Sequence, residues 1–518
     1  MERLQGLGGP FDVIVAGGGI IGAGIARDAA LRGLSVALVE KADYGGATTS
    51  GSTRLIHGGL RYLEMLDFRL VRMDLRERET LLRIAPHLVK PLEFLVPIYS
   101  RSAYYRARLR AGMVLYDALS FDKSLPHHRF LSASEMRRAE PHMETSGLQG
   151  AASYWDAQVN SPERLCLENV LDARARGAVA LNYAEVTGAI HEAGRVAGVK
   201  VRDTLHGGEA ELRARVVVNA SGPWFDHLAA RLAPPHPRRL IRTTKGVHLA
   251  CAPVSRHATV LFAREDGRLF FVIPWMGYSW VGTTDTDFTA DPASARATPE
   301  DARYLLDSAG VHFPGLCDGE VYWSNAGVRA LVTRPGDESS VSRLHGIRTD
   351  IPGLVSVLGG KITGYRAIAE DAVDAVCREL KHNRPASTAS TPLPGATSAA
   401  PQDHLDTLYG TRAGEVRRLA EERPALGERL APEYPDLAAQ VVFAVRREQC
   451  ARLSDFLLRR TVMGFSRDQG MAAVNRTAAL LAAELGWSAA RLNEECEAYR
   501  RWVRESRAFR ATVPEPVV

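Results

Sequence analysis

The sequence has few cysteines, and their spacing defines no site. Six cysteines occur in 518 residues, at positions 166, 251, 317, 377, 450 and 496, and no two of them are close neighbours. Zinc sites and disulfide frameworks are typically built from closely spaced cysteines. We therefore expect neither, predict no metal site, and expect the thiols to be reduced and buried.

Long apolar runs are also missing. No apolar stretch approaches the roughly 18 to 20 residues that a membrane-spanning helix needs. The N-terminal region lacks the basic, then apolar, pattern of a secretion signal with its cleavage site. We therefore expect a cytoplasmic protein.

Strong charge of one sign is absent as well. The formal net charge is +5, which is modest for a chain of 518 residues that should hold two or three domains. This balance is compatible with an anionic substrate or with contact to an acidic membrane surface. The basic residues form no concentrated stripe of a known nucleic-acid-binding module, so we expect no nucleic-acid partner.

The strongest positive signal lies near the N-terminus, in residues 11–40. The apolar run from Val13 to Ala16 predicts a buried parallel strand, and small residues from about Ile20 to Arg32 predict a helix. A second strand is predicted from Ser35 to Val39. This order of strand, helix and strand is typical of a dinucleotide-binding unit.

Glycines stand at the positions that such a unit requires. Gly17 suits the tight turn, Gly19 admits a pyrophosphate against bare backbone, and Gly22 lets helix and strand pack closely. The phosphates would lie at the start of the helix, near Ile20 and Ile21, where free N–H groups favour an anion. The pattern therefore predicts a dinucleotide ligand.

An acid and a polar loop follow the second strand. Glu40 comes at the right interval to accept a hydrogen bond from a ribose hydroxyl. Residues 41–54 are rich in glycine and hydroxyl groups and could wrap a polar ligand, although a flexible surface loop is the alternative. In the first interpretation, the candidate contacts are Thr49, Ser50 and Ser52.

The next segments combine polar and apolar character. A histidine, an arginine and a tyrosine surround a glycine pair at 57–62, and a helix is predicted from Asp67 to Ile84, before Pro86. Residues 101–119 alternate arginines with tyrosines and then become apolar. This segment is either an amphipathic helix resting on anionic lipid or a solvated face packed on its own domain.

Two later strands also run into glycine-containing turns. The apolar residues 216–218, followed by Asn219, lead to Ser221 and Gly222, as a second contact with a dinucleotide requires. Residues 353–358 form an apolar strand that precedes a glycine pair and a helix reaching about Leu380. The N-terminus of that helix is a second positive dipole end available to a ligand.

Taken in order, these motifs resemble those of the FAD-dependent glycerol-3-phosphate dehydrogenases, within the larger group of D-amino-acid-oxidase-like flavoproteins. The resemblance rests on GGGIIGAGIARDAALRGLSVALVE, LIHGGLRYLE, NASGPW, TTKGVHL, FFVIPW, VGTTDTD, NAGVRAL and LGGKITGYR, across residues 11–366. Arg54 departs from the lysine usual in the family, and Gly364 from its usual second threonine. The long insertion that marks the family's oxygen-using oxidases is lacking, which favours a quinone as acceptor.

The resemblance implies an α/β fold with a Rossmann-type FAD-binding domain, an antiparallel-sheet substrate domain and a C-terminal helical domain. In the substrate domain, 269–275 and 280–285 should be neighbouring strands. The helical domain serves either dimerisation or acceptor docking, and a homodimer is expected. The boundaries expected are 1–95, 150–235 and 340–382 for the FAD-binding domain, 96–149 and 236–339 for the substrate domain, 383–403 for a linker, and 404–518 for the helical domain.

The reaction implied is the oxidation of sn-glycerol 3-phosphate to dihydroxyacetone phosphate, with hydride transfer from C2 to flavin N5 and electrons passed to a quinone. The substrate phosphate needs planar, bidentate donors, for which arginine is suited. Arg329 and Arg343 are the choices for this role, with Arg61 as a third candidate. Tyr62 and Thr284 are further candidates for substrate contact.

The remaining roles implied concern the proton and the flavin. His248 matches the family position of the base, and His57 one that lies against the flavin, although the sequence alone does not rank the two. Lys361 would place positive charge where the reduced flavin gains negative charge. The full set of expected FAD contacts is Gly17, Gly19, Ile20, Ile21, Gly22, Glu40, Thr49, Ser50, Ser52, Asn219, Ser221, Gly222, Gly360, Lys361, Ile362 and Thr363.

Other functions stay open at this stage. A flavoenzyme of the same fold could oxidise an amino acid or a 2-hydroxy acid, and glycerol 3-phosphate could be oxidised with oxygen in place of a quinone. A flavin-binding protein without catalysis is a third alternative, disfavoured by the concentration of histidine, arginine and lysine in the motifs.

Overall fold

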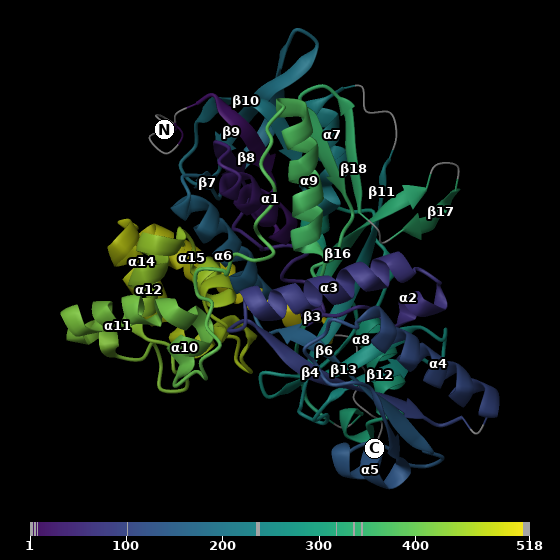
Figure 1. Cartoon of the computed structure of the whole chain (residues 1–518). Helices are drawn as coiled ribbons and strands as arrows, with labels where there is room; N and C mark the ends of the chain where they lie inside the picture. The colour runs from purple at the N-terminus through teal and green to yellow at the C-terminus, as the bar shows by residue number, and fades with distance from the viewer. Residues whose placement is uncertain are drawn as a thin grey trace.

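The computed structural model describes residues 4, 7, 9–100, 102–234, 239–317, 319–334, 337–342 and 345–510, and of residues 61, 64, 334 and 337–342 only the backbone. Two large sheets and a group of C-terminal helices make up this part of the chain (Figure 1). Within it, no helix is both long and apolar enough to cross a membrane.

The smaller sheet contains the strand–helix–strand unit predicted at the N-terminus. Six of its eight strands follow the order β18-β19-β10-β1-β2-β7, and β9 pairs with β10 while β8 pairs with β9. The strand β1 pairs in parallel with both β2 and β10, and its Val and Ile side chains are buried, as a strand covered on both faces requires. The strands are β1 (Phe11–Ala16), β2 (Val36–Val39), β7 (Val179–Leu181), β8 (Ala184–Glu192), β9 (Arg195–Asp203), β10 (Glu209–Asn219), β18 (Gly346–Ile351) and β19 (Leu354–Leu358).

Three helices lie beside this sheet, and the first of them packs against the other two (Figure 1). They are α1 (Ile20–Leu31), α6 (Pro162–Ala175) and α9 (Tyr365–Leu380). A Cβ atom on Gly24 would lie only 3.0 Å from the ring of Tyr365, so the small residue lets α1 approach α9 closely. The helix α7 (Phe225–Leu232) contacts β8 and β10.

The larger sheet has eleven strands in the order β17-β16-β11-β14-β13-β12-β4-β6-β3, with β15 paired to β11 and β5 to β6. Its pairs are antiparallel except for β4 with β12. The predicted neighbours at 269–275 and 280–285 are confirmed as β13 and β14, although β14 ends at Gly282. The strands are β3 (Leu55–Ile56), β4 (Val89–Ile98), β5 (Arg129–Ser132), β6 (Gly150–Val159), β11 (Ile241–Cys251), β12 (Ala258–Phe262), β13 (Leu269–Trp275), β14 (Tyr278–Gly282), β15 (Thr286–Asp287), β16 (Val321–Arg334) and β17 (Asp337–Ser342).

The pairing of β3, β4 and β6 bears on the expected domain boundaries. Residues 1–95 and 150–235 were assigned to the FAD-binding domain, yet these three strands pair within the larger sheet. Strand pairing depends on partners far away in the chain, so composition gives little sign of it. The division into domains therefore stays a prediction.

The remaining helices lie around the larger sheet and at the C-terminal end. They are α2 (Arg61–Glu64), α3 (Phe68–Ile84), α4 (Ala103–Leu119), α5 (Ala133–Ala139), α8 (Pro299–Gly310), α10 (His404–Tyr409), α11 (Ala413–Glu422), α12 (Ala438–Glu448), α13 (Leu453–Asp455), α14 (Val474–Leu485) and α15 (Ala489–Arg507), with a π-helical turn at Phe456–Arg460.

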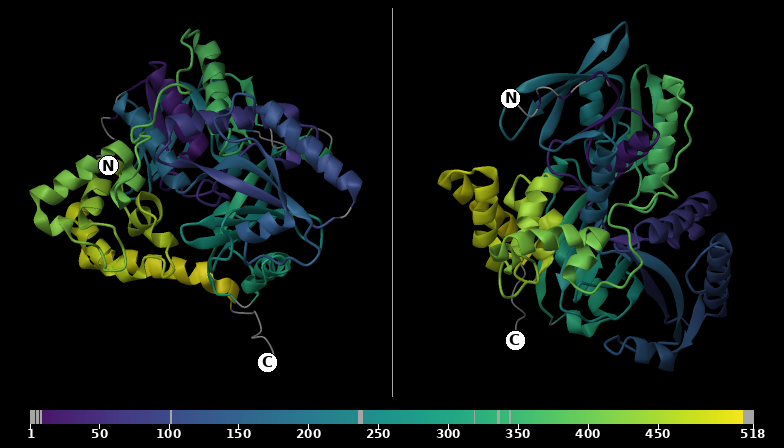
Figure 2. Two further views of the ribbon diagram at one scale, coloured as in Figure 1. Left: turned by 60° about the horizontal axis from the view of Figure 1, so that its bottom comes forward. Right: turned by 60° about the vertical axis from the view of Figure 1, so that its left-hand side comes forward.

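The C-terminal helices share a core with the larger sheet. Figure 2 shows them beside both sheets, and residues 383–403, predicted to be a linker, contain no helix or strand. The ring of Phe465 packs on Trp275 and Trp323, at centroid distances of 5.6 and 5.7 Å. Ser488 caps α15 by accepting the N–H of Arg491, as is typical of a helix N-terminus.

Candidate active site

A cavity of about 1030 Å³ opens where the two sheets and the C-terminal helices meet. Its wall includes the turn before α1, the loop 41–53, residues 220–224, the turn before α9 and part of β16. Segments distant in sequence therefore converge on one space, and most of the predicted site residues lie on its wall.

The turn before α1 is shaped by the glycines that the sequence analysis singled out. Gly17 has φ +113°, and a Cβ atom there would lie 2.6 Å from the carbonyl oxygen of Ala220. A Cβ atom on Gly22 would lie 1.8 Å from the carbonyl oxygen of Gly17. A Cβ atom on Gly19, by contrast, would meet only the hydroxyl oxygen of Thr49, at 3.6 Å, and Gly19 lines the cavity with Ile20 and Ile21. This combination leaves bare backbone at a helix N-terminus, as anion binding requires.

Glu40 is held by backbone N–H groups on both carboxyl oxygens. Gly18 donates to Oε2 at 2.6 Å and Ala42 donates to Oε1 at 2.8 Å. Burial nevertheless raises the pKa of Glu40, because it outweighs these hydrogen bonds. The side chain lines the cavity, and a carboxylate has further lone pairs for a ribose hydroxyl.

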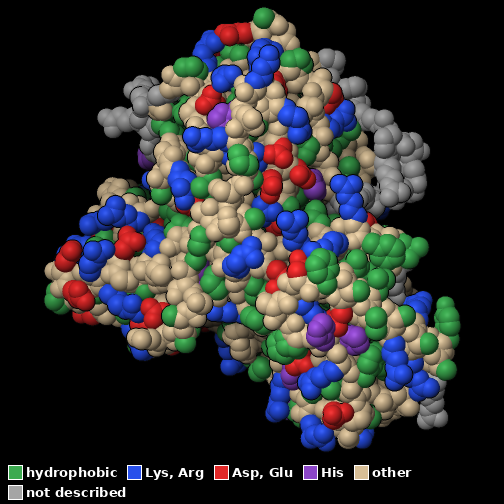
Figure 3. Space-filling model, viewed as in Figure 1, with side chains coloured by type: hydrophobic (Ala, Val, Ile, Leu, Met, Phe, Trp, Pro, Cys, Tyr) green, Lys and Arg blue, Asp and Glu red, His purple; other side chains and the backbone are tan. Residues whose placement is uncertain are grey.

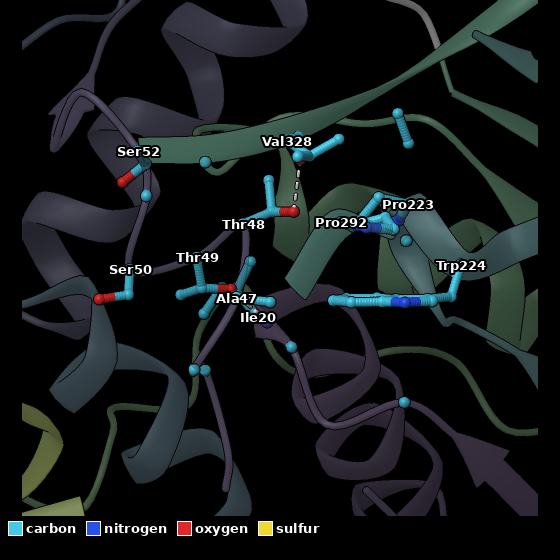
Figure 4. Close-up of a pocket in the computed structure, with 18 of the residues that line it drawn as sticks. Ile20, Ala47, Thr48, Thr49, Ser50, Ser52, Pro223, Trp224, Pro292 and Val328 are labelled. Carbon is cyan, nitrogen blue, oxygen red and sulfur yellow. Dashed lines mark hydrogen bonds between the residues drawn. The ribbon is translucent and has the colours of Figure 1, made fainter. Parts of the chain in front are cut away.

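The three predicted hydroxyl residues of the next loop all lie on the cavity wall (Figure 4). Thr49 accepts the N–H of Ile20 at 3.1 Å, Ser50 donates to Glu163 at 2.6 Å, and Ser52 accepts the N–H of Arg54 at 3.3 Å. Thr48 donates to the carbonyl oxygen of Val328 in the larger sheet. These bonds make the loop a connection between α1, α6 and β16.

Arg54 anchors the end of this loop in a buried ion pair. Its guanidinium donates to both oxygens of Glu163, at 2.9 and 3.1 Å, and both side chains are fully buried. The guanidinium also lies 4.4 Å from the ring of Trp275 and 4.5 Å from that of Phe465. The planar cation thus stacks and pairs at once, which a lysine could not do in the same way. Nothing in the sequence pointed to Glu163.

Residues 219–224 form another part of the wall. Ser221 and Gly222 line the cavity, whereas Asn219 is fully buried and accepts hydrogen bonds from the N–H and hydroxyl of Ser221. Figure 4 shows the flat ring of Trp224 beside Pro223 and Pro292. The ammonium of Lys41 lies 3.6 Å from the centre of that ring, so the wall carries a cation–π pair that was not predicted.

The turn before α9 presents Gly360, Lys361, Ile362 and Thr363 to the cavity. The ammonium of Lys361 lies 2.7 Å from Oδ2 of Asp74 on α3 and 3.7 Å from the centre of the Tyr62 ring. Burial raises the pKa of Asp74 to about 6. Asp74 had no signal in the sequence.

Both predicted histidines face the same cavity. His248 on β11 stacks on Trp280 at 5.0 Å, and its Nε2 lies 3.0 Å from the hydroxyl of Thr53. Burial first, and then the positive charges of Arg329 and Arg54, lower the pKa of His248 well below its usual value. The side chain is therefore neutral at pH 7 and able to accept a proton.

His57 occupies a different part of the wall. Its ring packs edge-on against Phe271 at 6.0 Å, and its backbone N–H donates to the hydroxyl of Thr363 at 3.2 Å. This bond joins residues 57–59 to the turn before α9. The structure thus brings His57 and Lys361 to adjoining segments of the wall.

Arg329 on β16 lines the cavity with about a fifth of its side chain exposed. Its guanidinium donates to Asp285 at 3.0 Å, to the hydroxyl of Thr283 at 2.8 Å, and to the carbonyl oxygen of Thr284 at 3.2 Å. The positive charge of Arg329 helps to hold the pKa of Asp285 below its usual value, against the opposing effect of burial. The arginine is therefore held in a fixed orientation.

The other four predicted substrate contacts have different outcomes. Thr284 is buried and outside the cavity wall, and its hydroxyl accepts the N–H of Val247. Tyr62 lines the cavity. Arg343 and the side chain of Arg61 lie outside the described part of the structure.

The C-terminal helices supply a further part of the wall that the sequence analysis missed. Arg459 lines the cavity and pairs with Asp43 at 2.5 Å, and Arg460 pairs with the same carboxylate at 2.6 Å. The two arginines hold the pKa of Asp43 well below its usual value despite burial. Both belong to the π-helical turn, a feature that often occurs at functional sites.

The residues present fit FAD. The bare backbone at Gly19 and the helix N-terminus suit a pyrophosphate, and Glu40 suits a ribose. The volume of the cavity is close to the upper end of the range usual for cofactor sites, roughly 300 to 1,000 Å³. Lys361 and the start of α9 offer positive charge to an electron-accepting ring.

Comparison with known proteins agrees with this fit. Residues 12–369 match the family model described as FAD dependent oxidoreductase. Residues 358–492 match the model for the C-terminal domain of alpha-glycerophosphate oxidase. The two matches place the chain among the FAD dependent oxidoreductases, and its cofactor is FAD.

Full-length relatives narrow this class. A glycerol-3-phosphate dehydrogenase of Synechocystis sp. is 38% identical over 535 aligned residues, covering 96% of this chain and 97% of that protein. The human mitochondrial glycerol-3-phosphate dehydrogenase is 34% identical, with 95% of this chain and 73% of the relative covered. The crystal structure of the Bacillus halodurans glycerol-3-phosphate dehydrogenase with FAD is 30% identical, with a TM-score of 0.78 and coverage of 98% and 96%. The chain belongs to the FAD-dependent glycerol-3-phosphate dehydrogenase family.

Proposed function

We propose that the protein oxidises sn-glycerol 3-phosphate to dihydroxyacetone phosphate and passes the electrons to a quinone. The observation that carries this proposal is the convergence of Arg329, His248, His57 and Lys361 on one cavity that fits FAD. FAD supplies the acceptor for the hydride that leaves C2 of the substrate, at its N5 atom. The protein residues must bind the phosphate, take the hydroxyl proton and place positive charge where the reduced flavin gains negative charge.

Arg329 is proposed to hold the substrate phosphate. Its guanidinium is always charged and can pair bidentately with a phosphate. Asp285 already pairs with the guanidinium and also with Arg268 at 2.7 Å, so the carboxylate fixes the direction of Arg329. Arg343 and Arg61 remain candidates for a shared phosphate site.

His248 is proposed to take the proton of the substrate hydroxyl. A general base must be unprotonated, and the lowered pKa of His248 keeps it so. Stacking on Trp280 fixes the ring plane, and Gly282 leaves room for the ring because a Cβ atom there would lie 2.4 Å from His248 Cδ2. His57, on another part of the wall, is proposed to position the ligands.

The deciding experiment is an anaerobic titration of the FAD-loaded protein with glycerol 3-phosphate. Bleaching of the yellow chromophore by this compound, and none by glycolate or D-amino acids, is the expected result. The opposite pattern would select an amino-acid or 2-hydroxy-acid enzyme, and no bleaching by any of them would select a non-catalytic flavoprotein. Reoxidation of the bleached protein with a soluble quinone analogue, compared with oxygen, then tests the acceptor.

Peripheral contact with an anionic membrane is part of the same proposal, because quinones are lipid-soluble. The helix α4 buries only Met113 and Tyr116, and it exposes Tyr104, Val114 and Leu115. Figure 3 shows hydrophobic and basic side chains side by side over α2 and α4. Such a mixture suits a helix resting on anionic lipid. The expected homodimer also stays a prediction.

Charge reversal on α4 tests the membrane contact. Arg106, Arg108 and Arg110 are exposed there, and their replacement by glutamate should release the protein from vesicles containing phosphatidylserine. The matched control reverses Arg137 and Arg138, which are exposed on α5. Equal vesicle binding by both variants would remove the membrane contact from the proposal.

A further inference from the structure

Asp74 has a buried carboxyl group with only one oxygen engaged. The side chain is fully buried on α3. Its Oδ2 accepts from the ammonium of Lys361 at 2.7 Å, whereas its Oδ1 has no hydrogen-bond partner among the residues described. Buried polar atoms are nearly always hydrogen-bonded, so an exception beside Lys361, a residue of the cavity wall, calls for an explanation.

The missing donor can be traced to Gly364. A Cβ atom built on this glycine would lie 3.4 Å from Asp74 Oδ1. Its other near neighbour, Met73 Cε at 3.2 Å, is the end of a flexible side chain. Gly364 has φ −89° and ψ 6°, a conformation open to other residues. A side chain at this position would therefore face Oδ1, and glycine leaves the oxygen without a donor.

The other charged groups around Asp74 are already paired. Asp156 on β6 pairs with Arg78 at 2.6 Å and accepts the hydroxyl of Tyr116 at 2.6 Å. Glu77, on the same helix as Asp74, pairs with Arg366 on α9 at 2.6 Å. Asp74 and Lys361 are thus left to balance each other, and the negative charges of Asp156 and Glu77 disfavour a further negative charge at Asp74.

We propose that Asp74 is a positioning residue for Lys361. Glycine at position 364 leaves the Asp74 carboxylate weakly stabilised, and protonation of that carboxylate releases the positive charge of Lys361 toward the cavity. The ionised carboxylate holds the ammonium in an ion pair and balances its charge. The protonated carboxyl group leaves Lys361 with the ring of Tyr62, 3.7 Å away, and with an unbalanced charge. This inference rests on the proposed place of Lys361 beside the flavin.

The visible absorption spectrum of the FAD-loaded protein, recorded against pH, tests the inference without substrate. A change of charge beside the ring should shift the spectrum in a transition centred at about pH 6, where the pKa of Asp74 lies. In G364S the added hydroxyl can donate to Oδ1 and stabilise the carboxylate, which should lower the midpoint by about one pH unit. The matched control, G364A, adds the same Cβ atom without a donor, and its midpoint should not fall.

A third variant, D74N, removes the titratable carboxyl group itself. D74N should abolish the transition, because the amide does not titrate in this range. Equal midpoints in G364S and G364A, or a transition that persists in D74N, would overturn the inference. If D74N does not retain FAD, the G364S and G364A pair decides alone. Failure of glycerol 3-phosphate to bleach the unmodified protein would refute the proposed function but leave this spectral test intact.

Discussion

The turn between β1 and α1 and the turn between β19 and α9 both bring a helix N-terminus to the cavity, but they act through different parts of the chain. The first turn contributes backbone, and α1 requires glycine beside it, because a Cβ atom at Gly22 would lie 1.8 Å from the carbonyl oxygen of Gly17. The second turn carries Lys361, whose charge is balanced by Asp74. A Cβ atom on Gly360 would lie 2.8 Å from Ile21 Cδ1, so the two turns also contact each other. We infer from this difference that one turn holds the cofactor and the other adjusts it.

The largest expected effect comes from G22A. The methyl group would meet the carbonyl oxygen of Gly17, which cannot move without distorting the turn. We expect protein purified without flavin, measured as the ratio of flavin to protein absorbance. G112A is the matched control, because no atom lies within 4 Å of a Cβ atom there. Normal flavin content in G22A would show that the first turn does not hold the cofactor.

The next effect tests the second turn. K361M should keep its flavin but slow reduction by substrate about 100-fold, the magnitude typical for loss of one preorganised electrostatic group. Anaerobic stopped-flow absorbance measures the rate, and K200M, which removes an exposed lysine, is the control. Loss of flavin at an unchanged rate per bound flavin would reverse the roles assigned to the two turns.

A smaller effect is expected at the substrate side of the cavity. R329K keeps the charge but loses the planar fork, and we expect kcat/KM to fall about 10-fold, mainly through KM. Steady-state kinetics measure it, and R242K changes a neighbouring arginine that pairs with Asp287 away from the cavity wall. Equal effects of the two substitutions would remove Arg329 from the phosphate site.

The smallest effect concerns pH. The pKa of His248 lies well below its usual value, so the base stays neutral until the pH falls through that lowered pKa. We expect kcat/KM to change little between about pH 6.5 and pH 7.5 and its acid limb to lie below the ordinary histidine value of about 6.5. An acid limb at or above that value would favour a base other than His248.

The part of the site that could be predicted from sequence depends on local contacts. Gly17, Gly19 and Glu40 were found because strand, turn, helix and strand follow one another within thirty residues. Asp74 lies 287 positions from Lys361, and Glu163 lies 109 positions from Arg54. Such pairs are created by packing, and single residues on amphipathic helices give no sign of them.

The strand assignments show the same limit. The apolar runs of β1 and β2 were recognised, because buried parallel strands consist of continuous Val, Ile and Leu. The pairing of β3, β4 and β6 in the larger sheet was not foreseen, since it depends on partners elsewhere in the chain. Thr284 was expected to contact substrate, yet its hydroxyl accepts the N–H of Val247, and the strand expected to reach residue 285 ends at Gly282.

The pairing of Asp43 with Arg459 and Arg460 has a consequence for biosynthesis. The acid is made near the start of translation and its partners more than 400 residues later, at separations of 416 and 417 positions. Until the ribosome has delivered the π-helical turn, the carboxylate lacks its counter-charges and the adjoining hydroxyl-rich loop lacks its final support. We therefore expect uptake of the coenzyme only in the last stage of maturation, after nearly the whole polypeptide has emerged.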